Sequence, residues 1–339
     1  MHSGMHYGHM NNYRVMFNMH RIQLGRLLLC LALFFAGSLF AEEATEANIF
    51  LPSAAKHVNW VFSGIVTNER DEQYGYIFQM QRENDKFHAM AALLDAQSKK
   101  VILFDESEAI IPEPKANNWQ VGNEFMSFNP INDSWIFGFK TKDKKGFNFK
   151  VDMLDALEHK PIVQNLRPGM RLLISQTSRL NGHLQVETGE GKNTGEQFVT
   201  AKNAWFRQVW LNEEEDKNHL FSGVLCQFND NSGFYSVNIE EEDAQQGAVT
   251  GLCNAQGKSL SMSQFIDVKR GEDGLWHIKI SSPKHHLSVP EEINNKTVIA
   301  GFITEDKQPG FCVLSQNELG KEALLKPQAP AENEVNPAA

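Results

Sequence analysis

The sequence has few cysteines and none of the short motifs that mark common enzyme classes. Its four cysteines include no Cys-x-x-Cys pair, so redox or zinc chemistry on paired thiols is not expected. A Gly-x-Ser-x-Gly elbow, a Walker loop, a dinucleotide fingerprint and a His-Glu-x-x-His motif are all absent. These absences argue against the standard hydrolases, nucleotide-dependent enzymes and zinc proteases.

Positive charge is also scarce. The 339 residues carry a formal net charge of −10, and residues 1–41 hold three arginines and no acid, so the rest of the chain carries −13. Such a chain repels phosphate backbones, and nucleic acid is therefore not an expected partner. With 41% hydrophobic and 22% charged residues, the composition is that of a globular protein and excludes disordered, collagenous and polytopic membrane classes.

The N-terminus resembles a secretory signal peptide. Residues 27–41 form an apolar run that follows Arg21 and Arg26 and ends at Ala41. The run is too short for a membrane span, so we expect cleavage near Ala41 and a mature protein in the periplasm or outside the cell. Met19 is an alternative start that would give a signal peptide of ordinary length. No membrane span is expected in the mature chain.

Three cysteines follow the signal peptide: Cys226, Cys253 and Cys312. The first two lie on the first and third of three consecutive predicted strands, too far apart in a meander for a disulfide. We expect three buried free thiols. A Cys226–Cys312 disulfide is the alternative if the last hairpin returns to the first strand of its sheet.

Period-two apolar patterns separated by turn residues predict an all-β protein, as sandwich or barrel. In the first half the predicted strands are 58–67, 74–82, 87–95, 100–104, 135–140, 146–153, 171–176 and 183–188. In the second half they are 220–228, 233–240, 247–254, 258–267, 275–281, 297–303 and 310–315. The polar, glycine-rich stretch 188–195 predicts a boundary between domains 42–195 and 196–320, and the proline-containing tail 321–339 is expected to be disordered.

A short fragment occurs in both halves. Phe62-Ser-Gly-Ile-Val matches Phe221-Ser-Gly-Val-Leu, and each is followed after about a dozen residues by a glycine and an aromatic residue, at Gly75-Tyr and Gly233-Phe. This suggests duplicated β units.

The aromatic positions predict a pocket or a core. Along a strand, segment 205–210 places Gln208 on one face with Phe206 and Trp210, and Arg207 on the other with Trp205 and Val209. If either polar residue faces the interior, it sits among aromatic rings as in a ligand pocket. If it faces outward, it is an ordinary surface residue, and the residues alone leave both alternatives open.

Two segments resemble a known family. Asn59-Trp-Val-Phe-Ser-Gly64, followed by Tyr74-Gly-Tyr-Ile-Phe-Gln79, resembles the opening motif of the hydroxyneurosporene synthase (carotenoid 1,2-hydratase, AttH-like) family. Ala204-Trp-Phe-Arg-Gln-Val-Trp210 resembles its second motif, Ala-Trp-x-Asp-His-x-Trp-Gly. The resemblance spans residues 55–290 and implies two tandem lipocalin-like antiparallel β-barrels or barrel-like sandwiches.

The sequence departs from the family where the hydratase chemistry is expected. The family's Asp-His pair falls on Arg207 and Gln208, and its Tyr-x-Asp proton donor falls on Tyr235 and Val237. Valine has no proton to donate, and neither Arg207 nor Gln208 is a practical acid at neutral pH. The resemblance therefore implies a retained fold and pocket with the hydratase chemistry lost.

We expect an exported lipocalin-like protein that binds an apolar or amphipathic, lipid- or isoprenoid-like small molecule without a cofactor or a metal. The expected ligand-binding residues are Trp60, Trp205, Arg207, Gln208, Trp210 and Tyr235. One alternative is an enzyme acting on such a molecule with a rearranged acid, drawn from Asp267, Asp230, Glu187 or His183. Another is an envelope interaction module whose barrels are filled by side chains.

Overall fold

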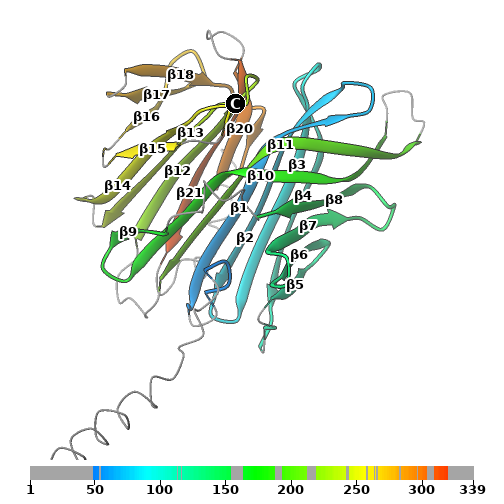
Figure 1. Cartoon of the computed structure of the whole chain (residues 1–339), viewed down its shortest axis with the longest axis horizontal. Coiled ribbons are helices and arrows are strands. Elements are labelled where there is room, and N and C mark those ends of the chain that lie inside the picture. Colours follow the sequence, from blue (N-terminus) through cyan, green and yellow to red (C-terminus); the bar gives the residue numbers. More distant parts are fainter. Residues whose placement is uncertain are drawn as a thin grey trace, which may run out of the picture. The chain divides into compact units, whose positions relative to one another are not determined.

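The computed structural model describes residues 49–319, except for 53–54, 113, 116, 154–162, 188–192, 212–218, 242–243, 257–258, 263, 265, 282–283, 296 and 304–308. The expected signal peptide, the expected disordered tail and most of the polar stretch 188–195 lie outside these residues. The regular elements of the described part are antiparallel strands (Figure 1). Within that part, no helix is long and apolar enough to cross a membrane. The all-β prediction is confirmed.

The first sheet has eleven strands and is nearly closed into a barrel. Its strands are β1 (His57–Asn68), β2 (Gln73–Glu83), β3 (Lys86–Asp95), β4 (Lys100–Ile110), β5 (Asn118–Val121), β6 (Glu124–Asn129), β7 (Ser134–Lys140), β8 (Gly146–Asp152), β9 (Val163–Arg167), β10 (Met170–Glu187) and β11 (Asn193–Leu211). They are ordered β4-β3-β2-β1-β11-β10-β8-β7-β6-β5, with β9 also pairing β10. The edge strand β4 contacts β5 and β6 near the opposite edge, which brings the ends of the sheet together.

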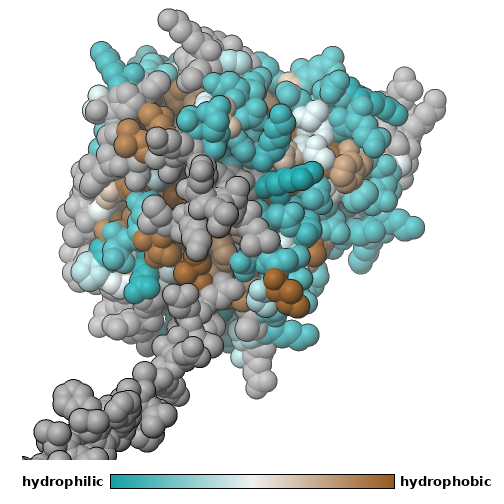
Figure 2. Space-filling model, viewed as in Figure 1, coloured by the Kyte–Doolittle hydropathy of each residue, from teal (hydrophilic) through white to brown (hydrophobic). Residues whose placement is uncertain are grey.

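Aromatic side chains fill the interior of the first sheet because alternate strand positions point inward. They include Trp60, Phe62, Trp119, Trp135, Phe137 and Phe206, all at most 2% exposed. The tightest pair, Phe62 and Phe137, stacks with ring centroids 4.1 Å apart. Hydrophilic residues predominate on the face of the molecule seen in Figure 2, and hydrophobic ones form separate patches there.

A second sheet of seven strands and a third of three strands follow. The second contains β12 (His219–Phe228), β13 (Gly233–Glu241), β14 (Ala244–Cys253), β15 (Ser259–Met262), β19 (Ile293–Asn294), β20 (Val298–Ile303) and β21 (Gly310–Leu319), in the order β15-β14-β13-β12-β21-β20-β19. The third contains β16 (Asp267–Arg270), β17 (Trp276–Ile280) and β18 (His285–Val289). Apolar residues of these two sheets pack together in one core, among them Val224, Ile278 and Leu287.

The change from the first to the second sheet lies later than the predicted boundary. Strand β11 pairs with β1 from His57↔Leu211 to Asn68↔Val199, and it also pairs with β10. Residues 196–211 therefore belong to the first sheet, and the domain boundary itself stays a prediction. Independent folding of the two halves stays a prediction.

A disulfide joins Cys226 to Cys312, 86 residues later. These cysteines face each other because β21 returns beside β12, with Cys226↔Cys312 in register. The expectation of three free thiols is wrong, and the alternative that depended on this strand return holds. Cys253 is buried and free, and burial raises the pKa of its thiol to about 12.

The repeated Phe-Ser-Gly fragments occupy matching places. Each lies on the first strand of its sheet, and that strand pairs with the last: β1 with β11, and β12 with β21. A Cβ on Gly64 would collide with Gln227 of the second sheet, and a Cβ on Gly223 would collide with Arg207 of the first. Each glycine thus makes room for a polar side chain from the opposite sheet.

Candidate functional site

The six residues predicted to bind a ligand divide between two cores on opposite faces of β1 and β11. Trp60 and Trp210 belong to the interior of the first sheet, and Gln208 bonds to Trp60 there. Trp205 and Tyr235 belong to the core between the first and second sheets, and Arg207 packs on Phe221 of that core. The structure therefore brings them together in two groups.

Gln208 is a buried structural residue of the first sheet. Its Oε1 accepts a hydrogen bond from Trp60 Nε1 at 2.8 Å, and its Nε2 donates to the carbonyl of Ile49 at 3.1 Å. It is 0% exposed, so the surface alternative is excluded for this residue. Its amide satisfies the indole N–H, which would otherwise be buried without a partner.

Trp205 and Tyr235 fix the contact between the first two sheets. Trp205 Nε1 donates to the carbonyl of Cys226 at 2.9 Å, and the Trp205 and Tyr235 rings meet edge to face at 5.8 Å. The Tyr235 hydroxyl accepts a bond of 3.4 Å from Gln164 Nε2. These contacts describe a packed interface.

Arg207 is a buried cation at the same interface. Its Nη2 donates to Asn59 Oδ1 at 3.3 Å and to Ser315 Oγ at 2.9 Å, and its guanidinium lies 4.6 Å from the Phe221 ring centroid. No carboxylate of the described chain pairs with it, and burial lowers its pKa to about 9. It is still protonated at neutral pH. Val237, at the family's acid position, is 0% exposed in the adjoining apolar core.

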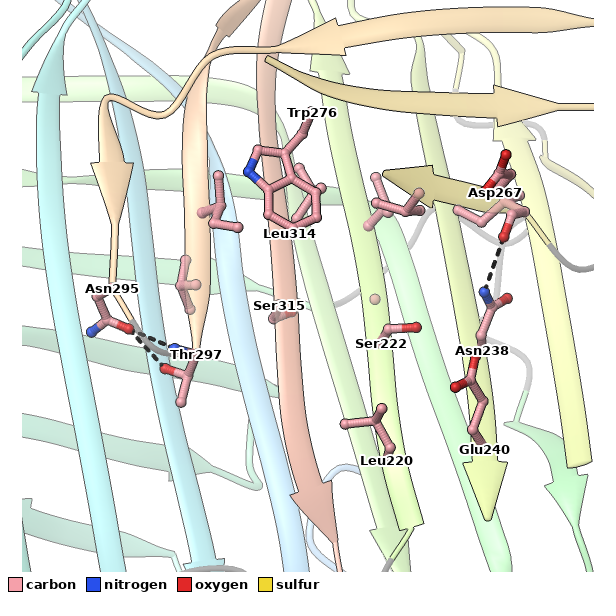
Figure 3. A pocket seen from close by; sticks show the side chains of 16 residues that line it. Leu220, Ser222, Asn238, Glu240, Asp267, Trp276, Asn295, Thr297, Leu314 and Ser315 are labelled. Atoms are coloured by element: carbon pink, nitrogen blue, oxygen red, sulfur yellow. Dashed lines mark hydrogen bonds between the residues drawn. The ribbon is translucent and has the colours of Figure 1, made fainter. Parts of the chain in front are cut away.

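A cavity of about 320 Å³ lies on the other face of the second sheet, where the three-stranded sheet covers it (Figure 3). Its lining residues are Leu220, Ser222, Gly223, Val224, Asn238, Glu240, Ile266, Asp267, Val268, Trp276, Asn295, Thr297, Val298, Ile299, Leu314 and Ser315. None of the six predicted residues lines it. The sequence signal that could have found it is the alternation of Leu220, Ser222 and Val224 along β12, which places a hydroxyl between two apolar neighbours on one face.

One polar side chain in the cavity wall is incompletely bonded. Asn238 is 5% exposed, and its Nδ2 donates to the carbonyl of Ile266 at 3.4 Å. Its Oδ1 has no hydrogen-bond partner. Asn238, Glu240 and Asp267 lie toward one side of the cavity, and Asn295 and Thr297 lie toward the other (Figure 3).

Of the four acids or bases considered for a rearranged enzyme, Asp267 reaches the cavity. It is exposed at the rim, where Lys269 Nζ lies 3.1 Å from its Oδ1. Asp230 is exposed in the β12–β13 turn and accepts a bond from the backbone N–H of Ser232. His183 is half exposed beside Glu196, and the Glu187 side chain lies outside the described residues.

A buried carboxyl group is found elsewhere. Glu124, at the start of β6, is 0% exposed, and burial together with the charge of Asp105 raises its pKa to about 8. It belongs to the first sheet and is absent from the residues that line the cavity. The described residues contain no group of three or more metal-binding side chains.

No protein-family model matches the chain, and no curated protein matches it in sequence. Solved structures match its fold, among them the following two. One is a provisionally assigned AttH protein from Nitrosomonas europaea, with a TM-score of 0.55 and 13% identity, covering 81% of this chain and 96% of its own. The other is kievitone hydratase from Nectria haematococca, with a TM-score of 0.54 and 11% identity, covering 81% and 94%. The chain therefore shares the fold of these proteins, and the resemblance read from the sequence is supported at the level of the fold.

Proposed function

We propose that this protein is an exported lipocalin-like binding protein that holds one small apolar or amphipathic molecule in the cavity between its second and third sheets. The observation that carries the proposal is the cavity itself. Its volume of about 320 Å³ lies within the range of about 300–1,000 Å³ that is usual for small-molecule sites.

The wall of the cavity supports an apolar occupant. Seven of its sixteen lining residues are aliphatic and seven are polar, and the indole of Trp276 also faces it (Figure 3). Trp276, Val268 and Ile299 are only partly buried, so a ligand that covered them would remove apolar surface from water at about 25 cal/mol per Å². The alternative of an interaction module predicts barrels that are filled by side chains. The aromatic interior of the first sheet fits that prediction, whereas the second sheet borders a cavity.

Loss of the hydratase chemistry is part of the proposal. The name of kievitone hydratase refers to a hydration reaction, and that activity is a property of that protein alone. Hydration of an alkene needs a group that can protonate carbon. In this chain the family position holds Val237, and beside it Arg207 is a hydrogen-bond donor that keeps its proton at neutral pH.

Export is also proposed. The N-terminal segment has the charge and apolar pattern of a signal peptide. The disulfide between Cys226 and Cys312 is the kind of bond that persists in oxidising compartments. Detection of the protein with an N-terminus near Glu42 in the periplasmic or secreted fraction would test this point.

The binding proposal can be tested with the fluorescent probe N-phenyl-1-naphthylamine. Ser222 lies in the cavity wall, and its replacement in Ser222→Trp would fill the space with an indole. The matched control is Ile131→Trp, at a site 93% exposed in the first half of the chain. We expect wild type and the control to bind the probe, and Ser222→Trp to lose at least tenfold in affinity at an unchanged melting temperature. Equal binding by all three would refute the cavity as the site.

A further inference from the structure

Several hydrogen-bond donors of the cavity wall are already used by the protein. Asn238 Nδ2 donates to the Ile266 carbonyl, which fixes the amide orientation because a carbonyl only accepts. Trp276 Nε1 donates to Glu291 Oε1 at 2.6 Å. These bonds use the indole N–H of Trp276 and one of the two N–H groups of the Asn238 amide.

The opposite side of the cavity shows the same pattern. Asn295 Nδ2 donates to Glu106 Oε1 at 3.3 Å, and Thr297 Oγ1 donates to Asn295 Oδ1 at 3.1 Å. Ser222 and Ser315 keep their hydroxyl donors, because Ser315 Oγ accepts its bond from Arg207.

Acceptors, in contrast, are available. Asn238 Oδ1 is buried and has no partner, and leaving such an atom unpaired is costly. Glu240 lies two residues further along β13 on the same face, so its carboxylate adds negative charge beside the amide. Asp267 adds a second carboxylate at the rim.

Among the described residues, no cation pairs with Asn238 or Glu240, whereas Asp267 is paired with Lys269. The described lining residues include no lysine, arginine or histidine. At the rim, Lys269 is paired with Asp267, and Arg270 with Glu291 at 2.7 Å. The buried guanidinium of Arg207 packs on Phe221, on the opposite face of the second sheet, and its contact with the cavity wall is the bond that it donates to Ser315 Oγ.

We propose that the cavity, if it binds a ligand as argued above, selects an amphiphile whose polar end donates hydrogen bonds, namely an alcohol or an ammonium group, and rejects carboxylates and phosphates. The head group bonds to Asn238 Oδ1, and Glu240 favours a positive charge there. The apolar part lies against Trp276 and the aliphatic wall. This inference rests on the proposed function and narrows it to one class of ligand.

A series of ten-carbon ligands that differ only in head group tests this selection. Decan-1-ol, decylammonium and decanoate are titrated against bound N-phenyl-1-naphthylamine at about pH 8, where decanoic acid is ionised. We expect the alcohol and the ammonium ion to displace the probe at concentrations at least about tenfold lower than decanoate does, a difference of one lost hydrogen bond or more. Decanoate that binds as tightly as decan-1-ol overturns the proposal.

Two variants locate the effect. Asn238→Leu should weaken decan-1-ol about tenfold while probe binding is retained, and Glu240→Gln should weaken decylammonium several-fold and leave decan-1-ol unchanged. The matched control is Asn165→Leu, an exposed position on β9. Unchanged decan-1-ol affinity in a folded Asn238→Leu protein also counts against the proposal. If Asn238→Leu does not fold, the wild-type ligand series decides alone.

The two proposals fail in different ways. Probe binding that survives Ser222→Trp places the ligand elsewhere and removes the proposed function. Probe binding that is lost in Ser222→Trp, together with preferred binding of decanoate, keeps the cavity as the site and removes the head-group selection.

Discussion

The first sheet and the second sheet share one strand pairing but are stabilised differently. In both, the first strand pairs with the last. The first sheet has no cysteine, and its interior is an aromatic cluster in which Trp135 contacts five rings at centroid distances of 4.8–6.4 Å. The second sheet has a disulfide between its first and last strands and keeps open space beside them. The same strand pairing thus accompanies a packed aromatic interior in one half and a cavity in the other.

The repeated glycines show how the halves fit together. Gly64 admits Gln227, whose Oε1 accepts a 2.9 Å bond from the backbone N–H of Ile65 and whose Nε2 donates to the Asn203 carbonyl. Gly223 admits Arg207 in the reverse direction. Each half therefore carries a polar residue that completes the other, which favours a fixed arrangement of the first two sheets.

The largest expected effect is on the aromatic interior. Trp135→Ala should lower the free energy of unfolding by about 3–5 kcal/mol because it removes a fully buried ring. Trp276→Ala, at the half-buried cavity wall, should lower the free energy of unfolding by only about 1 kcal/mol, and it should also weaken binding of the probe. Urea denaturation of both variants measures the contrast. Equal losses of stability would contradict the difference between a tightly packed first half and a second half with a cavity.

The next effect concerns the disulfide. The Cys226→Ala, Cys312→Ala double variant should have a free energy of unfolding about 2–4 kcal/mol lower than wild type, as expected when a disulfide that closes a long loop is removed. Reduction with dithiothreitol should lower the stability of wild type to that of the double variant and leave the double variant unchanged. A wild-type protein with no sensitivity to dithiothreitol would show that the bond does not hold the second sheet.

A smaller effect is expected where the halves meet. In Gly223→Ala the new methyl group would collide with the Arg207 guanidinium, and we expect a loss of about 1–3 kcal/mol from overpacking. Ser222→Ala, one residue earlier on the cavity face, is the control and should stay within about 0.5 kcal/mol of wild type. Combining Gly223→Ala with Arg207→Met should recover part of the loss, and no recovery would argue against this contact.

The pH dependence of stability tests the acid in the first half. The pKa of Glu124 is about 8 in the folded protein and 4.5 in the reference state, so between these values the folded chain keeps a proton that the unfolded chain releases. Stability from this group is present at low pH and is lost as the pH rises from about 4.5 to about 8. Relative to Glu124→Gln, wild type should lose about 1–3 kcal/mol between about pH 5 and about pH 8. Parallel pH profiles would contradict the raised pKa.

The smallest effect on structure is expected from a cut in the polar stretch 188–195. Its glycine-rich sequence predicts early cleavage by proteases there or after Gly320. Since β10 and β11 pair with each other and both belong to the first sheet, the two fragments should stay associated on a sizing column. First cleavage within 220–280 would contradict this prediction.

Much of the strand pattern could be predicted from the sequence because alternation is a local property. The segment 58–67 is observed as β1 (His57–Asn68), and 233–240 as β13 (Gly233–Glu241). The segments 171–176 and 183–188 were predicted separately but form one strand, β10, in which the intervening residues continue the pairing with β11. The polar residues between the two segments predicted an interruption, but pairing with β11 keeps this stretch in the strand.

The candidate site was much less accessible to sequence reasoning. Alternation identified which residues of 205–210 share a face, and the structure agrees with that division. It did not identify which face borders empty space. The cavity joins Leu220 of β12 to Trp276 of the separate three-stranded sheet and Leu314 of the last strand, and that arrangement follows from packing between distant segments.

The pairing of first strands with last strands has a consequence for how the chain folds. His57 of β1 pairs with Leu211, and Cys226 of β12 forms a disulfide with Cys312. Neither contact can form until the last strand of its sheet has been synthesised. Proteins dominated by such distant contacts have high contact order and fold slowly, in milliseconds to seconds. A chain that folds slowly stays unfolded during its synthesis, and under the proposed export this delay would keep it unfolded until it has crossed the membrane.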